Sequence, residues 1–325
     1  MTVIPIQLHN NPEDSLFFDE KQTQEIVVSL FSECNMKCKF CFQKNIDIIR
    51  WSKENTDIRI RLFEKALPKI KRHNIKIKIA GGELFQDKLI ERGALEDYQR
   101  FIDEYKALMD SYGKTYYFSI TTNLVLSKHI DDVIKFVKKN NIEIVCSYDF
   151  DGRFTKESQI KNFLKNIDAL DKNGIISKIN FVVTNKALQM LIYDRDHELV
   201  KIFDSLYKTH PVTYEYYTNM GIKEYDLTEE ELGNGLCALY DLYPKIENFE
   251  VVKNSLKTFP TCCQCIWIDT VLLMGCSDHK TNSTEFLSNK GCFSCDYYYR
   301  CPKSCPRIFH QNKECFVKML YDHWK

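Results

Sequence analysis

Six short segments in the first two thirds of the chain are rich in β-branched and aromatic residues, a composition typical of β-strands. They are residues 25–31, 75–80, 116–122, 142–150, 176–184 and 212–218. Between them lie segments whose apolar positions recur every three to four residues, as in an amphipathic helix. The clearest of these are residues 57–72, 95–113, 127–140 and 158–174, two of which end at glycines, a common helix terminator. The pattern predicts alternating strands and helices.

This alternation predicts an α/β fold with a parallel sheet over residues 25–220. Residues 1–24 precede it as an N-terminal extension, and residues 221–257 form a connector. The connector contains one predicted helix, opened by a capping box of Thr228 and Glu231 and weakened by two glycines. Residues 258–325 contain few aliphatic side chains and many cysteines, so we expect bound metal to stabilise them.

Composition describes an ordinary protein of 325 residues with 45 basic and 45 acidic side chains. A net charge of zero gives no reason to expect a nucleic-acid partner. The N-terminal residues lack the cationic and apolar regions of a signal peptide, and no apolar run is long enough to span a membrane. We therefore expect a cytoplasmic protein, in which the 14 cysteines bind metal instead of forming disulfides.

The segment FSECNMKCKFCFQ places Cys34, Cys38 and Cys41 at the spacing C-x3-C-x2-C, just after the first predicted strand. A closed structural zinc site needs four ligands. Three thiolates can instead hold three irons of a cubane iron–sulfur cluster and leave the fourth iron open. The alternatives are a zinc site with a distant fourth ligand and three unrelated cysteines. Catalytic groups of parallel sheets lie at the carboxyl ends of strands, which favours the iron–sulfur cluster.

Polar segments follow the next three predicted strands as well. AGGELF contains Gly81, Gly82 and Glu83 after the second strand. Paired glycines let a backbone approach a ligand closely, and a carboxylate can bind an ammonium group, although an ordinary turn has the same pattern. The third strand is followed by ITTN, and the fourth leads into CSYDFDG. Four such segments at successive strand ends indicate one shared site.

In this order the segments resemble the radical S-adenosylmethionine enzymes, whose signature is C-x3-C-x2-C with an aromatic residue before the last cysteine. The resemblance implies a partial (β/α)6 TIM-like barrel with a 4Fe-4S cluster on Cys34, Cys38 and Cys41. It also implies that S-adenosyl-L-methionine is bound by Phe40, Gly81, Gly82, Glu83, Thr121, Thr122, Asn123, Ser147 and Asp149. The family's S-x-D-G element carries two extra residues here, before Gly152.

The resemblance further implies the chemistry. The amino and carboxylate groups of S-adenosylmethionine chelate the open iron, and one-electron reduction cleaves the sulfonium. The resulting 5'-deoxyadenosyl radical takes a hydrogen atom from the substrate. Such enzymes need an electron donor such as flavodoxin or ferredoxin.

Strand alternation sorts the neighbouring side chains. If Ser147 and Asp149 face the barrel interior, Glu143 does too, and Cys146 packs towards the helices. On the sixth strand two residues share a face, where each could reach a substrate or be a satisfied interior group: Glu215 and Tyr217.

The C-terminal cysteines form a second group. The run Cys292-x2-Cys295-x5-Cys301-x3-Cys305 with Cys315 resembles the distal half of a SPASM domain, which carries two auxiliary 4Fe-4S clusters. Zinc ribbons are the alternative. By the resemblance the outer cluster is bound by Cys292, Cys295, Cys301 and Cys315, and the inner one by Cys276, Cys305 and two of Cys262, Cys263 and Cys265. The glycine that usually precedes the second proximal cysteine by about five residues is absent here.

SPASM-bearing enzymes mostly modify peptides or proteins, so we expect an oxidised or crosslinked peptide or protein product. A peptide epimerase is an alternative, and it would return a hydrogen atom to the substrate from a cysteine thiol. Cys237 could supply that thiol, although its apolar neighbours also fit a buried packing residue. A dehydrogenase or epimerase acting on a sugar or aminocyclitol is another, and a non-catalytic iron–sulfur or zinc scaffold is a third. The short N-terminal extension leaves no room for a leader-binding domain, so a separate leader-binding protein could hold a peptide substrate.

Overall fold

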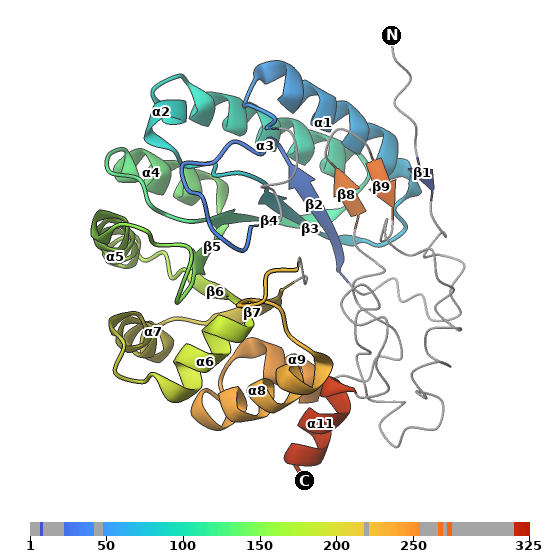
Figure 1. The fold of residues 1–325 in the computed structure, drawn as a ribbon. Helices are drawn as coiled ribbons and strands as arrows, with labels where there is room; N and C mark the ends of the chain where they lie inside the picture. Colours follow the sequence, from blue (N-terminus) through green and yellow to red (C-terminus); the bar gives the residue numbers. More distant parts are fainter. Residues whose placement is uncertain are drawn as a thin grey trace.

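The computed structural model describes residues 7–8, 23–41, 48–217, 221–253, 266–268, 272–274 and 315–325. Its centre is a curved sheet in which six parallel strands follow one another in chain order, as the sequence predicts (Figure 1). These strands are β2 (Gln24–Ser29), β3 (Asn74–Ala80), β4 (Thr115–Thr122), β5 (Glu143–Tyr148), β6 (Lys178–Val183) and β7 (Val212–Tyr216). The α/β half-barrel expected from the sequence is confirmed.

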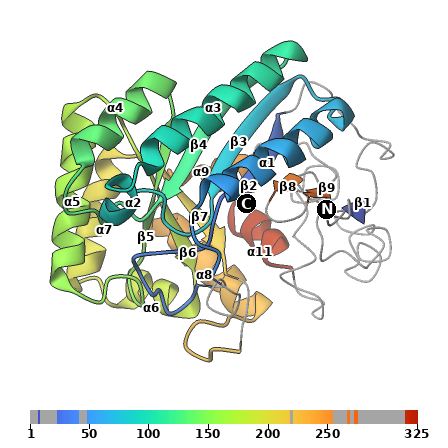
Figure 2. The same cartoon turned by 90° about the horizontal axis from the view of Figure 1, so that it is seen from above.

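Helices cover the outer side of this curved sheet (Figure 2). They are α1 (Lys53–Ala66), α2 (Asp87–Ile90), α3 (Ala94–Ser111), α4 (Ile130–Asn140), α5 (Glu157–Lys172), α6 (Asn185–Tyr193) and α7 (Glu198–Thr209), with a short 3-10 helix, η3 (Leu67–Lys69), after α1. Gly113 and Gly174 follow α3 and α5 with φ of 62° and 73°, the left-handed conformation that ends many helices.

The sheet is wider than the sequence predicts, because three short strands extend it beyond β2. β8 (Ile266–Ile268) pairs in parallel with β2, and β9 (Leu272–Met274) pairs antiparallel with β8. β1 (Gln7–Leu8) then adds in parallel to β9. Strands of two or three residues are too short to produce a readable alternation, so the sequence pattern does not reveal them.

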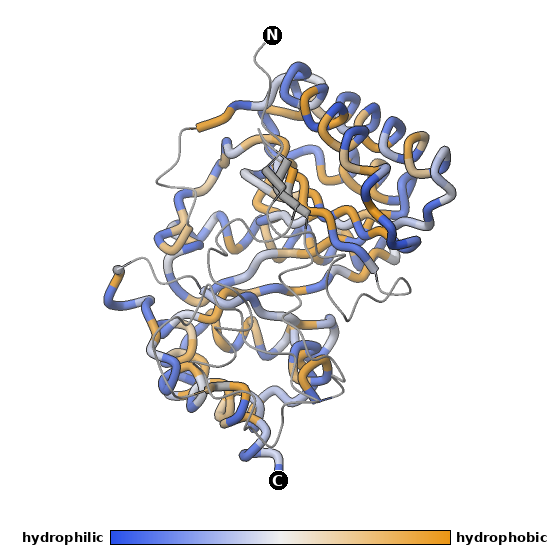
Figure 3. The backbone as a smooth tube through the Cα atoms, turned by 90° about the vertical axis from the view of Figure 1, so that its right-hand side faces the viewer, coloured by the Kyte–Doolittle hydropathy of each residue, from blue (hydrophilic) through white to orange (hydrophobic). Residues whose placement is uncertain are grey.

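The two faces of the sheet differ in polarity. In β3 the isoleucines at 75, 77 and 79 are buried in the main core, whereas Lys76 and Lys78 alternate with them on the other face. In β5 the Tyr148 ring packs against Phe163 of α5 and Phe203 of α7, so its face points to the helices. Hydrophilic and hydrophobic positions also alternate along the helices (Figure 3). The hydrophobic core therefore lies between sheet and helices, and the inner face is polar.

The connector after β7 contains α8 (Glu229–Leu242) and α9 (Glu247–Lys253). Thr228 and Glu231 form the predicted capping box at the start of α8. The expected weakening by glycine does not interrupt the helix. A side chain at Gly235 would lie 2.4 Å from Cδ1 of Leu188 in α6, so this glycine permits close packing of the two helices.

The last helix, α11 (Phe316–His323), packs on the connector. Leu320 and Tyr321 are buried, and the Tyr321 hydroxyl donates to the Val252 carbonyl of α9 at 2.6 Å. The C-terminal helix is thereby attached to the connector. Among the described helices, none combines the length and the apolar character needed to cross a membrane.

Candidate functional site

The predicted cysteine loop directly follows β2 and is held on both sides by backbone hydrogen bonds. On one side Ser32 N and Glu33 N donate to the Ile49 carbonyl. On the other side Gly82 N donates to Phe31 O at 2.8 Å, and Glu83 N donates to Glu33 O at 3.0 Å. The loop after β3 is therefore paired directly with the start of the cysteine loop.

The two glycines of this loop allow that close approach. A Cβ on Gly82 would lie 1.9 Å from Glu33 O, and one on Gly81 would lie 2.3 Å from Phe31 O. Gly81 also has φ of 131°, which other residues rarely adopt. A side chain at either glycine would therefore point into the backbone of the cysteine loop. A direct contact between the glycine backbone and S-adenosylmethionine stays a prediction.

Glu83 is completely buried beside the loop. Its Oε1 accepts hydrogen bonds from Phe85 N at 2.9 Å and Thr122 Oγ1 at 2.7 Å, and its Oε2 accepts one from Asn123 N at 2.5 Å. Burial raises the pKa of this carboxyl, and the three hydrogen bonds oppose that rise. The carboxylate therefore ties the end of β3 to the end of β4.

Asn123 connects the end of β4 to the cysteine loop. Its side-chain amide donates to Asn35 Oδ1 at 2.8 Å and lies 3.9 Å from the Cys34 sulfur. The neighbouring Thr121 hydroxyl is buried and has no hydrogen-bond partner within the described part of the chain. Such an orphaned polar atom is a natural contact for a bound polar ligand.

The loop after β5 completes the surroundings. Lys39 N, between the second and third cysteines, donates to the Gly152 carbonyl at 2.9 Å. Gly152 has φ of 87°, and a Cβ there would lie 2.8 Å from the Tyr225 hydroxyl. Asp149 is buried, and its Oδ2 also lacks a hydrogen-bond partner among the residues described. Loops from three strand ends therefore contact the cysteine loop.

The three thiols suit an iron–sulfur cluster. Cys34 is exposed, Cys41 is half-buried and Cys38 is buried, and burial raises the pKa of the Cys38 thiol. Metal binding must therefore displace the proton of Cys38. Over the described ranges, no three His, Cys, Asp or Glu side chains are grouped closely enough to share one metal ion. A cubane cluster does not require that grouping, because each thiolate binds its own iron.

Sequence reasoning missed Arg153 and Tyr225. The Arg153 guanidinium lies 5.4 Å from the centre of the Phe40 ring. Burial raises the pKa of Cys38 and of Asp149, and the positive charge of Arg153 opposes both rises. The Tyr225 ring contacts Phe40 edge-on at 6.2 Å. Arg153 directly follows the DFDG segment, so its place in the sequence could have identified it as a site residue. Tyr225 lies in the connector, where no sequence motif indicates a role in the site.

The serine and the interior residues lie as alternation predicts. Ser147 is half-buried on β5 beside Asn180 of β6. Glu143 forms ion pairs with Lys76 of β3 and Lys178 of β6 across the inner face. Cys146 is fully buried in the main core. The side chain of Glu215 on β7 is exposed, whereas Tyr217, which directly follows β7, packs in a buried cluster with Cys38 and Phe40.

Asp149 gives a testable pH dependence. Burial raises its pKa from 3.8 to about 8, and Arg153 and two backbone N–H groups only partly oppose this. Between pH 4 and pH 8 the folded chain therefore holds a proton that the unfolded chain releases, so stability falls as pH rises through this window. Asp149→Asn lacks this titration. In urea unfolding, we expect its stability relative to the wild type to rise by roughly 3.5 kcal/mol from pH 5 to pH 8.

Asp168→Asn is the matched control for this titration, because Asp168 is an exposed carboxylate on α5. Its stability relative to the wild type should stay flat over the same range. A flat difference for Asp149→Asn as well would show that the Asp149 carboxyl is ionised in the folded protein at pH 5.

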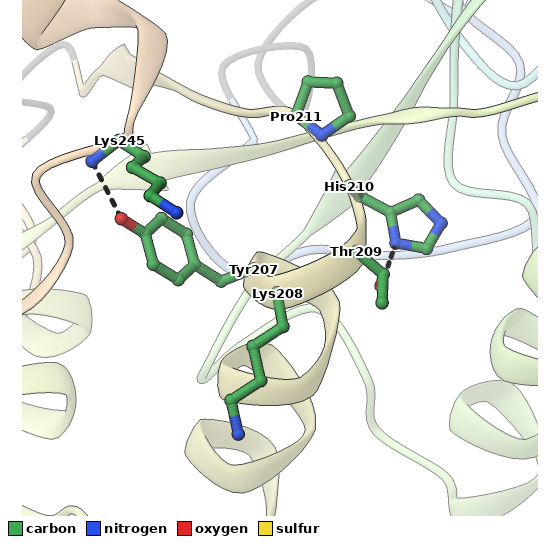
Figure 4. Close-up of a pocket in the computed structure, with 6 residues that line it drawn as sticks. All are labelled: Tyr207, Lys208, Thr209, His210, Pro211 and Lys245. Carbon is green, nitrogen blue, oxygen red and sulfur yellow. Dashed lines mark hydrogen bonds between the residues drawn. The ribbon is translucent and has the colours of Figure 1, made fainter.

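One cavity among the described residues lies away from this site. It has a volume of about 410 Å³ and is found where α7 ends and β7 begins (Figure 4). Its lining residues are Tyr207, Lys208, Thr209, His210, Pro211 and Lys245. The cysteine loop follows the carboxyl end of β2, whereas this cavity lies at the amino end of β7. It is therefore not part of the candidate site.

Most of the predicted auxiliary ligands lie outside the described residues: Cys262, Cys263, Cys265, Cys276, Cys292, Cys295, Cys301 and Cys305. Cys315 is described. It is the N-cap residue of α11 and is half-buried against the main core. The predicted ligand therefore occupies a fixed position at the end of the cysteine-rich segment.

Comparisons with known proteins agree with this geometry. The radical SAM cyclopropyl synthase TigE of Paramaledivibacter caminithermalis is 23% identical over 336 residues, covering 93% of this chain and 67% of TigE. The structure of native anSMEcpe with bound AdoMet and Cp18Cys peptide has a TM-score of 0.66 at 14% identity, covering 93% of this chain and 96% of that one.

A second fold neighbour is Streptococcus suis SuiB bound to its precursor peptide SuiA, with a TM-score of 0.55 and 16% identity. That match covers 90% of this chain and 75% of SuiB. No protein-family model matches the chain. The cysteine spacing, the half-barrel and the relationship to TigE together make this chain a homologue of the radical S-adenosylmethionine enzymes.

Proposed function

We propose that the chain is a radical S-adenosylmethionine enzyme that oxidises or crosslinks a peptide or protein. The observation that carries the catalytic part is the convergence of the β3, β4 and β5 loops on the cysteine loop, through Gly82, Asn123 and Gly152. The peptide part is supported by two fold neighbours, anSMEcpe and SuiB, whose structures contain peptides.

Each of these loops contributes residues with a different role. Cys34, Cys38 and Cys41 would hold a 4Fe-4S cluster, which would supply the electron for reductive cleavage of S-adenosylmethionine. The orphaned oxygens of Thr121 and Asp149 are available to contact that ligand. Glu83 acts through its hydrogen bonds, which hold the ends of β3 and β4 in register beside the loop.

We assign residues 25–220 to the catalytic barrel, 221–257 to the connector and 258–325 to a SPASM-like domain with two auxiliary 4Fe-4S clusters. Auxiliary clusters suit a reaction in which an electron leaves the substrate after hydrogen abstraction, as in oxidation or crosslinking. The electron donor would be a flavodoxin or ferredoxin, and a separate protein could present the leader of a peptide substrate.

A peptide epimerase is the second candidate, and Cys237 is the residue that bears on it. An epimerase returns a hydrogen atom, commonly from a thiol. Cys237 lies on α8, packs against the main core and has a pKa raised by burial. Its position in the connector helix favours a packing role, so oxidation or crosslinking remains our proposal.

The proposal is tested by reconstituting the protein anaerobically, counting iron and sulfide, and measuring 5'-deoxyadenosine formed with dithionite. About 12 irons per chain with cleavage would support one catalytic and two auxiliary clusters. About 8 irons would remove one auxiliary cluster and favour an epimerase or dehydrogenase. Zinc in place of iron, with no cleavage, would contradict the proposal and favour a scaffold.

A further inference from the structure

Cys34 is the least enclosed of the three cysteines in the loop. Its side chain is exposed, whereas that of Cys41 is half-buried and that of Cys38 is buried. Backbone hydrogen bonds anchor the loop on either side of Cys34, at Glu33 and at Lys39. Between these anchors, residues 34–37 form no backbone hydrogen bond to another element within the described part of the chain. Side-chain contacts must therefore hold Cys34 in place.

Asn123, directly after β4, provides such a contact. Its Nδ2 donates a hydrogen bond of normal length to Asn35 Oδ1 at 2.8 Å, and it lies 3.9 Å from Cys34 Sγ, a longer and weaker contact. An amide nitrogen carries two hydrogens, so both contacts can exist together. Asn35 follows Cys34 directly, which places their Cα atoms about 3.8 Å apart. Fixing the Asn35 side chain therefore restricts the backbone that carries the cysteine sulfur.

Asn123 is itself held firmly. It is 4% exposed, its backbone N donates to Glu83 Oε2 at 2.5 Å, and its Oδ1 accepts from Val125 N at 2.9 Å. A backbone N–H can only donate, so the bond from Val125 identifies the amide oxygen and leaves the nitrogen facing the cysteine loop. The acceptor, Asn35, is exposed. Asn123 is thus the fixed partner, and the cysteine loop is the part that it holds.

We propose that Asn35 and Asn123 form a positioning pair that holds Cys34 where its thiolate binds iron. This inference rests on the proposed function and deepens it, because it gives a role to Asn35, which no motif indicates. Hydrogen-bonding partners of metal ligands orient those ligands, and losing such a partner commonly weakens metal binding ten- to a hundredfold. The pair acts on Cys34 mainly through the neighbouring residue, so we expect an effect at the lower end of this range.

The test follows the opening of the iron–sulfur bond at Cys34 in the reconstituted protein, without S-adenosylmethionine. A chelator is added anaerobically together with iodoacetamide, which alkylates a thiol only after its bond to iron has opened. Mass spectrometry of the digested chain then gives the alkylation rate of each cysteine separately. We expect Asn35→Ala to raise the rate at Cys34 about tenfold. Asn35→Asp should keep the wild-type rate, because its carboxylate accepts the same hydrogen bond.

A double-mutant cycle shows whether the two asparagines act through one contact. Asn123→Ala should also raise the rate at Cys34, and the double variant should react no faster than Asn123→Ala alone. A further tenfold rise in the double variant would overturn the inference, because the two side chains would then act independently.

Lys37→Ala is the matched control, because Lys37 is exposed in the same loop and has no hydrogen bond or ion pair among the described residues. It should keep the wild-type rate at Cys34. Cys146, fully buried in the main core, reports unfolding of the barrel, and its alkylation should be equally slow in every variant. Equal rates at Cys34 in Asn35→Ala and the wild type would overturn the inference. So would a tenfold rise in Asn35→Asp, or a rise at Cys146 that parallels the one at Cys34.

The wild-type protein separates this inference from the proposed function. If its Cys34 is protected from alkylation and it forms 5'-deoxyadenosine, equal rates in the variants would refute the positioning pair alone. If Cys34 of the wild type is alkylated at once after reconstitution, no iron is bound there, and the catalytic proposal fails together with the pair.

Discussion

Replacing Cys34, Cys38 and Cys41 together by alanine should reduce 5'-deoxyadenosine formation to the background level. The three side chains are the only protein ligands that we assign to the catalytic cluster, and alanine offers no atom that binds iron. Iron should also fall by about four atoms per chain, because one cubane is lost. The measurements are the iron content after anaerobic reconstitution and the product formed with dithionite.

Cys237→Ala is the matched control, because this thiol is also partly buried but lies on α8, away from the cysteine loop. It should keep full iron content and full cleavage. The catalytic proposal would be wrong if the triple variant still cleaved S-adenosylmethionine at the normal rate. A loss of cleavage in Cys237→Ala without loss of folding would instead direct attention to the connector.

The predictable part of the fold is the part governed by alternation. Strands β2 to β7 are five to eight residues long, and their apolar faces must pack on helices, so the pattern is visible in the sequence. The extension of the sheet by β8, β9 and β1 depends on pairing between distant segments. Such pairing uses backbone groups, which every residue carries, and leaves little trace in a short segment.

The candidate site shows the same division. Chemistry-bearing residues such as Cys34 and Glu83 could be predicted, because the residue types and their places after strands indicate what they can do. What the residues contact could not. Glu83 is enclosed by donors of its own chain, and Arg153 lies over Phe40 through a turn that no periodicity describes. Both contacts arise only when the loops meet.

Gly82→Ala should have the second large effect, because the new methyl group would meet backbone. The Cβ would lie 1.9 Å from Glu33 O and 2.7 Å from the Ser32 carbonyl carbon, and neither atom can rotate away as a side chain can. The two loops must therefore separate. That breaks the hydrogen bonds from Gly82 N to Phe31 O and from Glu83 N to Glu33 O.

We expect Gly82→Ala to lose about 3 kcal/mol of the free energy of unfolding, as overpacking and two lost hydrogen bonds add together. Iron content should fall as well, because Cys34 follows Glu33 directly. Gly113→Ala is the control: its φ is 62° but nothing lies within 4 Å of the new Cβ, so only backbone strain of about 1 kcal/mol is added. Equal stability of the two variants, with full iron in both, would mean that the loops are not paired as the structure has them. A large loss in Gly82→Ala alone would instead establish that the GGE segment first serves to hold the cysteine loop in place, with any contact to the cofactor depending on that support.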